Sequence, residues 1–135
     1  MTDIRINIQS DKKDVKVFLK ELKDILNSEK FNTGEDMIVV KSKKDEIEYS
    51  TEYLMVDLDY DESDIVERLK ELTLDEYSET LIDKVDDKPP LLFVFGKDIN
   101  NRLVYIKLKI KGEKSKKVLC LSFHYAKHTM PFPYK

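Results

Sequence analysis

Two stretches near the end of the chain, 103–110 and 118–125, alternate between apolar side chains and polar or small ones. Successive side chains of a β-strand point to opposite faces of its sheet, so each stretch is predicted to bury one set of positions and to expose the other. The exposed set combines a phenol, two ammonium groups, a hydroxyl and an imidazole: Tyr105, Lys107, Lys109, Ser122 and His124. Such groups can transfer protons and stabilise negative charge on a phosphate ester.

This chemistry suits the cleavage of RNA by attack of a ribose 2′-hydroxyl on the adjacent phosphate. A base must take the hydroxyl proton, cations must stabilise the phosphorane, and an acid must protonate the leaving 5′-oxygen. Tyr105 and His124 are the candidates for proton transfer, and Lys107 is the candidate for charge stabilisation. The candidates for holding RNA or phosphate are Lys97, Arg102, Lys109, Ser122 and His128. No metal or other cofactor is expected.

Each of these residues also has a structural interpretation. Alternating lysines form the solvated face of many sheets, and a tyrosine on such a face commonly packs across strands. His124 and His128 have the spacing of a metal-binding pair on a helix, but they follow a strand and no third ligand is near. The single cysteine, Cys120, lies in an apolar run and is predicted to be a buried thiol.

The charges divide the chain into two halves. Residues 88–135 contain eleven lysines and arginines against two acidic residues, a net charge of +9, which leaves −12 for residues 1–87 because the whole chain carries −3. A basic sheet beside an acidic half points to a polyanion, or to an acidic partner, as the occupant of the basic surface.

The spacing of apolar residues predicts an α+β fold in a single domain, 1–135. Ser10–Asp11 should begin a helix of about 16 residues, and the acids at 61–64 a second one. A short helix is expected over 50–57, a short strand over 37–40 and a solvated loop over 41–48. Residues 1–87 thus form an acidic, mainly helical half, and 88–135 a basic antiparallel sheet.

The strand alternation also predicts which side chains meet the helices. Packing the fully apolar faces inward places Val118 and Cys120 on the opposite face, with Ser122 and His124. The residues expected to face the helices are Val104, Ile106, Leu108, Ile110, Leu119, Leu121, Phe123 and Tyr125.

The composition bears on where the protein works. No apolar run approaches the roughly 20 residues that span a bilayer, so no membrane association is expected. A single cysteine excludes an intramolecular disulfide and suits a reducing cytoplasm. The sequence does not determine the oligomeric state, and a homodimer is one of the alternatives.

Three strings of residues resemble the MqsR family of bacterial toxins. These are Leu-Thr-x-x-x-Tyr at 72–77, Val-Phe-Gly-Lys followed by Val-Tyr-Ile-Lys-Leu-Lys within 94–109, and Cys-x-Ser-Phe-His to Pro-Tyr within 120–134. The resemblance covers roughly residues 72–135. It implies a RelE-like fold with helices packed on a small antiparallel sheet, an mRNA endonuclease that works without a metal, and a cognate antitoxin as partner.

The resemblance also implies roles for individual positions. The family's catalytic tyrosine falls on Tyr105, and one of its lysines falls on His124, a change of residue type. A second lysine falls on Ser78, and the glutamine expected near 92–96 has no counterpart. We therefore expect an endoribonuclease toxin. The alternatives are a non-catalytic RNA- or protein-binding module on the same fold, and a metal-dependent enzyme.

Overall fold

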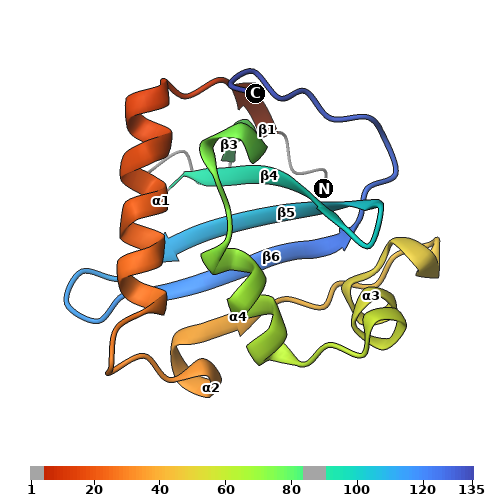
Figure 1. Ribbon diagram of the computed structural model, residues 1–135, viewed down its shortest axis with the longest axis horizontal. Helices are drawn as coiled ribbons and strands as arrows, with labels where there is room; N and C mark the ends of the chain where they lie inside the picture. The colour runs from red at the N-terminus through yellow and green to blue at the C-terminus, as the bar shows by residue number, and fades with distance from the viewer. Residues whose placement is uncertain (1–4, 84–90) are drawn as a thin grey trace.

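The computed structural model describes residues 5–83 and 91–135, which form a six-stranded sheet covered on one face by helices (Figure 1). The strands are β1 (Arg5–Ile8), β2 (Met37–Val39), β3 (Tyr77–Asp83), β4 (Leu92–Ile99), β5 (Arg102–Lys111) and β6 (Lys117–Tyr125). The helices are α1 (Lys12–Leu26), α2 (Thr33–Asp36), α3 (Thr51–Leu58) and α4 (Glu62–Lys70), with 3-10 turns η1 (Ile47–Tyr49) and η2 (Leu74–Glu76). The predicted α+β class is confirmed.

The sheet has the order β1-β3-β4-β5-β6-β2. Its strand pairs are antiparallel except for β2, which runs parallel to β6 at one edge. The predicted meander of three strands is therefore the centre of a larger sheet. β1 and β3 lie outside the strands that the sequence predicted, and with β2 they show that the acidic half supplies strands as well as helices.

Helices α1, α3 and α4 form where the sequence predicts them. Asp11 occupies the N-cap position of α1, and Ser50 caps α3 by accepting a hydrogen bond from the backbone N–H of Tyr53. At the start of α4, Asp61 and Asp64 each accept a hydrogen bond from the other's backbone N–H, which gives a reciprocal capping box. The side chains of Ser50 and Asp61 thus supply acceptors for N–H groups that have no partner within the helix, whereas the side chain of Asp11 makes no capping hydrogen bond.

The main core lies between these helices and one face of the sheet. Phe18 of α1 stacks on Phe93 of β4 with 4.1 Å between ring centroids. Further fully buried side chains come from both layers: Leu22, Leu54, Ile65, Leu69, Phe95, Ile106 and Phe123. The helices bury this face, and we call the opposite face of the sheet the outer face.

A β-bulge corrects the predicted alternation of β6. Lys107 pairs with Ser122, but the next residue of β5, Leu108, pairs with Cys120, so Leu121 is an extra residue in β6. Val118 and Cys120 therefore lie in the main core, whereas Leu119 and Leu121 do not, and the prediction for these four positions was wrong. A strict alternation cannot anticipate an inserted residue, because the bulge reverses the faces of every position on its far side.

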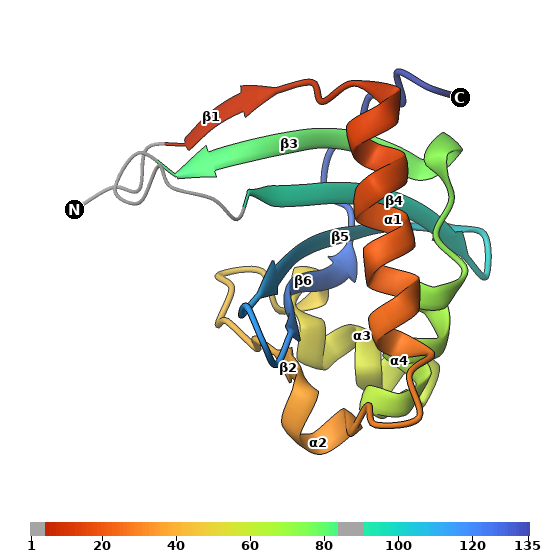
Figure 2. The same cartoon turned by 90° about the vertical axis from the view of Figure 1, so that its left-hand side faces the viewer.

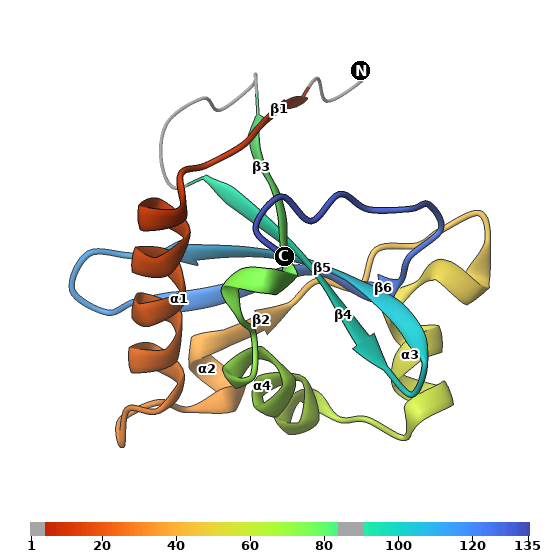
Figure 3. The same ribbon diagram turned by 45° about the horizontal axis from the view of Figure 1, so that its top comes forward.

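The last residues of the chain, 126–135, return across the outer face (Figure 3). Met130 packs with a small apolar cluster that includes Val94 and Tyr105, and Phe132 lies against Gly96. Beyond them Tyr134 donates a hydrogen bond to the carbonyl of Ser10. The tail thus covers the part of the outer face formed by β4 and leaves Tyr105 at its border.

We predict that Gly96→Ala destabilises the protein by about 1–3 kcal/mol, the usual cost of overpacking. A Cβ atom at Gly96 would lie 2.8 Å from the ring of Phe132 and 3.0 Å from Sδ of Met130. Urea unfolding would measure the loss, with Gly34→Ala as control, since a Cβ at Gly34 meets only Asn32 Oδ1 at 3.4 Å. If adding Phe132→Ala to Gly96→Ala recovered none of the loss, the close packing of the tail would be refuted.

Candidate functional site

The predicted outer-face residues come together on β5 and β6. Tyr105 pairs with His124 and Lys107 with Ser122, and paired residues of antiparallel strands share a face. The rings of Tyr105 and His124 are stacked, with 5.2 Å between centroids and 14° between planes. Lys109 pairs with Leu119 one step further along. The predicted sharing of one face by Tyr105, Lys107, Ser122 and His124 is therefore confirmed, although the sequence did not anticipate the bulge beside them.

One hydrogen bond fixes the orientation of the His124 ring. Nδ1 lies 2.9 Å from the carbonyl oxygen of Tyr125. A carbonyl oxygen only accepts, so Nδ1 carries the proton and the lone pair of the neutral imidazole is on Nε2. The Nε2 atom is therefore the one that can accept a proton from a substrate.

The surroundings of His124 favour its neutral form. Burial lowers its pKa from the usual 6.5, the hydrogen bond to the Tyr125 carbonyl acts in the opposite direction, and the charges of Lys44 and Lys107 lower it further. A histidine with this pKa is available as a base at neutral pH. Lys44 was not among the predicted site residues, because it comes from segment 41–48, which the sequence indicated only as a solvated loop.

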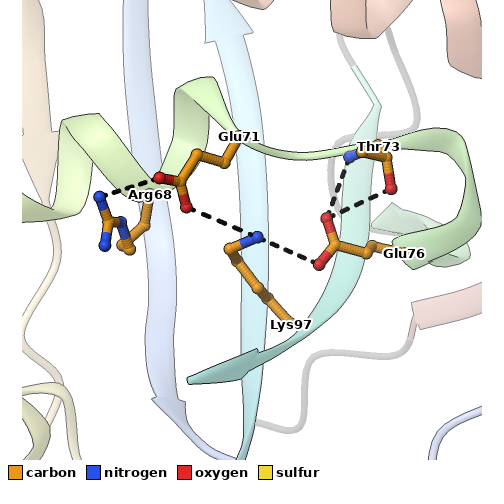
Figure 4. A network of polar contacts seen from close by, with 5 residues as sticks. All are labelled: Arg68, Glu71, Thr73, Glu76 and Lys97. Atoms are coloured by element: carbon orange, nitrogen blue, oxygen red, sulfur yellow. Dashed lines mark hydrogen bonds and ion pairs between the residues drawn. The ribbon is translucent and has the colours of Figure 1, made fainter. Parts of the chain in front are cut away.

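Lys97 lies on the other face of the sheet. Its ammonium group is 3.2 Å from a carboxylate oxygen of Glu76 and 3.7 Å from one of Glu71, and its side chain is only 15% exposed (Figure 4). Glu76 also accepts a hydrogen bond from the backbone N–H of Thr73, which holds that carboxylate in place. Lys97 therefore connects β4 to α4 and η2, and it is separated from Tyr105 and His124 by the sheet.

Arg102 is also engaged on the helix side. Its guanidinium lies 3.8 Å from the centroid of the Tyr125 ring and 3.7 Å from a carboxylate oxygen of Glu48. The hydroxyl of Tyr125 in turn donates a hydrogen bond to Asp57 of α3 at 2.5 Å. Burial and the nearby Asp57 raise the pKa of Tyr125 to about 12, so this phenol keeps its proton.

The remaining predicted residues divide between the site and its surroundings. Ser122 is buried beside Lys107 on the outer face, and His128 is exposed in the segment after β6. Ser78, where the resemblance places a lysine, is buried at an irregularity between β3 and β4, and its hydroxyl has no hydrogen-bond partner among the described residues. These positions do not add a further proton-transfer group to the pair of Tyr105 and His124.

The acidic helices do not cover the outer face. α3 and α4 pack on the opposite side of the sheet, where the segments that adjoin them supply the carboxylates near Lys97 and Arg102: Glu71 and Glu76 for Lys97, and Glu48 for Arg102. From β3, Glu79 is paired with Val94, which is itself paired with Lys107, so one acid shares the outer face two strands away from Lys107. The outer face of β5 therefore carries cations, Lys107 and Lys109, that the acidic helices do not cover.

No family model, curated protein or solved structure matches this chain. Within residues 5–83 and 91–135, no three or more histidine, cysteine or acidic side chains are grouped so that they could hold a metal ion. In the same residues no helix has the length and apolar character that crossing a membrane requires. The site is therefore interpreted from its own geometry.

We predict that His124 titrates below pH 6.5 in an NMR titration of the imidazole protons, assigned with His124→Ala. Because burial and two lysine charges oppose protonation of the folded form, Lys44→Ala should raise the pKa of His124. Between 6.5 and the folded pKa, the unfolded state binds a proton that the folded state does not, so this contribution to stability falls as the pH falls. A midpoint at or above 6.5 in the wild type would contradict the described surroundings.

Lys97→Met should reduce stability by about 1–3 kcal/mol without weakening RNA binding, since it removes the ammonium group that lies near both Glu71 and Glu76 and leaves the mostly buried carboxylate of Glu76 without its ion-pair partner. Lys70→Met is the matched control, because Lys70 pairs with Glu67 on the surface of α4 and such pairs contribute less than about 1 kcal/mol. Urea unfolding and an RNA-binding titration would measure both variants. Two results would contradict the position of Lys97 on the helix side of the sheet. One is an equal loss of stability in Lys97→Met and Lys70→Met, and the other is weaker RNA binding by Lys97→Met alone.

Proposed function

We propose that this protein is an endoribonuclease that cleaves mRNA without a metal, and that it acts as the toxin of a toxin–antitoxin pair. The observation that carries the proposal is His124, whose Nδ1 is bound to a backbone carbonyl so that the lone pair is on Nε2, and whose ring stacks on Tyr105 on the face that also carries Lys107. Neutral imidazole, phenol and ammonium groups on one face supply the base, the acid and the charge that RNA transesterification requires.

In the proposed reaction, His124 Nε2 accepts the proton of a ribose 2′-hydroxyl, and the 2′-oxygen forms a bond to phosphorus. Lys107 stabilises the negative charge of the phosphorane. The bond from phosphorus to the 5′-oxygen then breaks, and Tyr105 donates its proton to that oxygen. The products are a 2′,3′-cyclic phosphate and a free 5′-hydroxyl, and solvent returns the proton from His124 to Tyr105.

The assignment as a toxin rests on the resemblance of residues 72–135 to the MqsR family. The matched strings fall on η2 and on β4, β5 and β6, which include the strands that carry Tyr105 and His124. A RelE-like arrangement of helices on a sheet is compatible with this topology. An antitoxin that neutralises this protein would bind the lysines of β5 on the outer face through acidic side chains, or would cover that face.

The engagement of Lys97 and Arg102 favours a second candidate function. Both cations are close to carboxylates on the helix side, so the outer face has fewer charges for the phosphorane than the sequence suggested. A surface that binds RNA through Lys107 and Lys109 without cleaving it would need no such additional charge. Binding without cleavage is therefore the alternative to the nuclease.

We predict that the purified protein cleaves RNA in the presence of EDTA and leaves 2′,3′-cyclic phosphate ends. His124→Ala should reduce the rate by about 10²–10⁴-fold, the usual contribution of general acid–base catalysis, and Tyr105→Phe should also impair it. Lys16→Ala, at an exposed position of α1, is the control with little effect, and circular dichroism would verify the fold of each variant. Expression in a bacterial host should arrest growth for the wild type and not for His124→Ala.

Three results would contradict this proposal. Intact RNA after incubation with soluble wild-type protein that nonetheless binds it would favour the non-catalytic module. Cleavage that requires a divalent cation, or that continues unchanged in both His124→Ala and Tyr105→Phe, would refute the assigned roles.

A further inference from the structure

Segment 41–46 lies along the free side of β6. At its start, the backbone N–H of Val40 donates to the carbonyl of Cys120 at 2.9 Å, and at its end Glu46 pairs with Lys127. These two contacts fix the ends of the segment at positions before and after His124 along the chain, and they place the segment near His124.

This segment carries a second group of cations on the outer side of the sheet. Its residues are exposed, and three of the first four are lysines: Lys41, Lys43 and Lys44. Figure 2 shows the segment, drawn in gold, on the side of the sheet away from α1 and α4. The charges of Lys44, from the segment, and of Lys107, from β5, both lower the pKa of His124.

Aromatic rings lie beside these cations. The rings of Tyr105 and His124 are stacked on the outer face, and Tyr105 is two residues before Lys107 on β5. Proteins that hold single strands combine cations along the backbone with aromatic rings on which unpaired bases stack.

We propose that Lys44 binds the backbone of a single-stranded RNA substrate opposite Lys107, so that the strand lies along β6 with its reacting phosphate at His124. The proposal rests on the proposed nuclease function for the identity of the substrate. It adds a binding residue from the acidic half of the chain, and it restricts the substrate to unpaired RNA.

The test uses a short labelled DNA strand, which has no 2′-hydroxyl and so reports binding whether or not the protein cleaves RNA. Fluorescence anisotropy would give the association constant between roughly 50 and 200 mM salt. Each phosphate contact contributes about 0.7 to the slope of log K against log salt for single strands. Lys44→Ala should therefore reduce the magnitude of the slope by about 0.7, whereas Lys16→Ala, at an exposed position of α1, should leave it unchanged.

Three outcomes would overturn the proposal. Equal slopes for Lys44→Ala and the wild type, or an equal reduction in Lys16→Ala, would show that Lys44 makes no backbone contact. A DNA duplex of the same sequence is titrated in the same way, and tighter binding of this duplex than of the single strand would refute the restriction to unpaired substrates. RNA cleavage is measured separately, so a protein that shows the Lys44 effect but cuts no RNA would refute the nuclease and leave the binding surface established.

Discussion

The pairing of β5 with β6 determines which side chains of these two strands lie on each face of the sheet. On the outer face it places Tyr105 opposite His124 and Lys107 opposite Ser122. On the helix face, the bulge at Leu121 allows Val118 and Cys120 to enter the core together with Phe123 and Tyr125. A shift of one residue in this register would move the imidazole away from the phenol and remove apolar side chains from the core. Stability and the chemistry of the site therefore depend on the same set of backbone hydrogen bonds.

The sheet also separates the charges of the chain. Cations on the helix face meet the acidic elements that cover it, as Lys97 does with Glu71 and Glu76. Cations on the outer face surround a neutral histidine and an aromatic ring. Ion pairs within the molecule therefore offset part of the charge difference between the two halves. Lys107 and Lys109 of β5 remain as cations on the face that carries the candidate site, where positive charge attracts anions before any specific contact forms.

The elements that the sequence predicted well are those with a regular period. The apolar stripe of α1 and the alternation of β5 needed no information beyond neighbouring residues, and they placed Tyr105 and Lys107 correctly. The run 92–95 in β4 is apolar at every position, so it gave no indication of which face Lys97 would occupy. β1 is short, and its pairing with β3 depends on a contact between distant parts of the chain. The position of Lys44 near His124 also depends on a contact between distant parts of the chain, because the parallel pairing of β2 with β6 brings the segment of Lys44 toward His124.

The most direct test of the central claim is the pH dependence of RNA cleavage in EDTA, measured beside the NMR titration of His124. If His124 is the base, the rate should rise with pH through a midpoint below 6.5 that coincides with the pKa of this ring, and Lys44→Ala should move both midpoints upward together. A rate that follows a different titration, or that does not change while His124 gains its proton, would contradict the account.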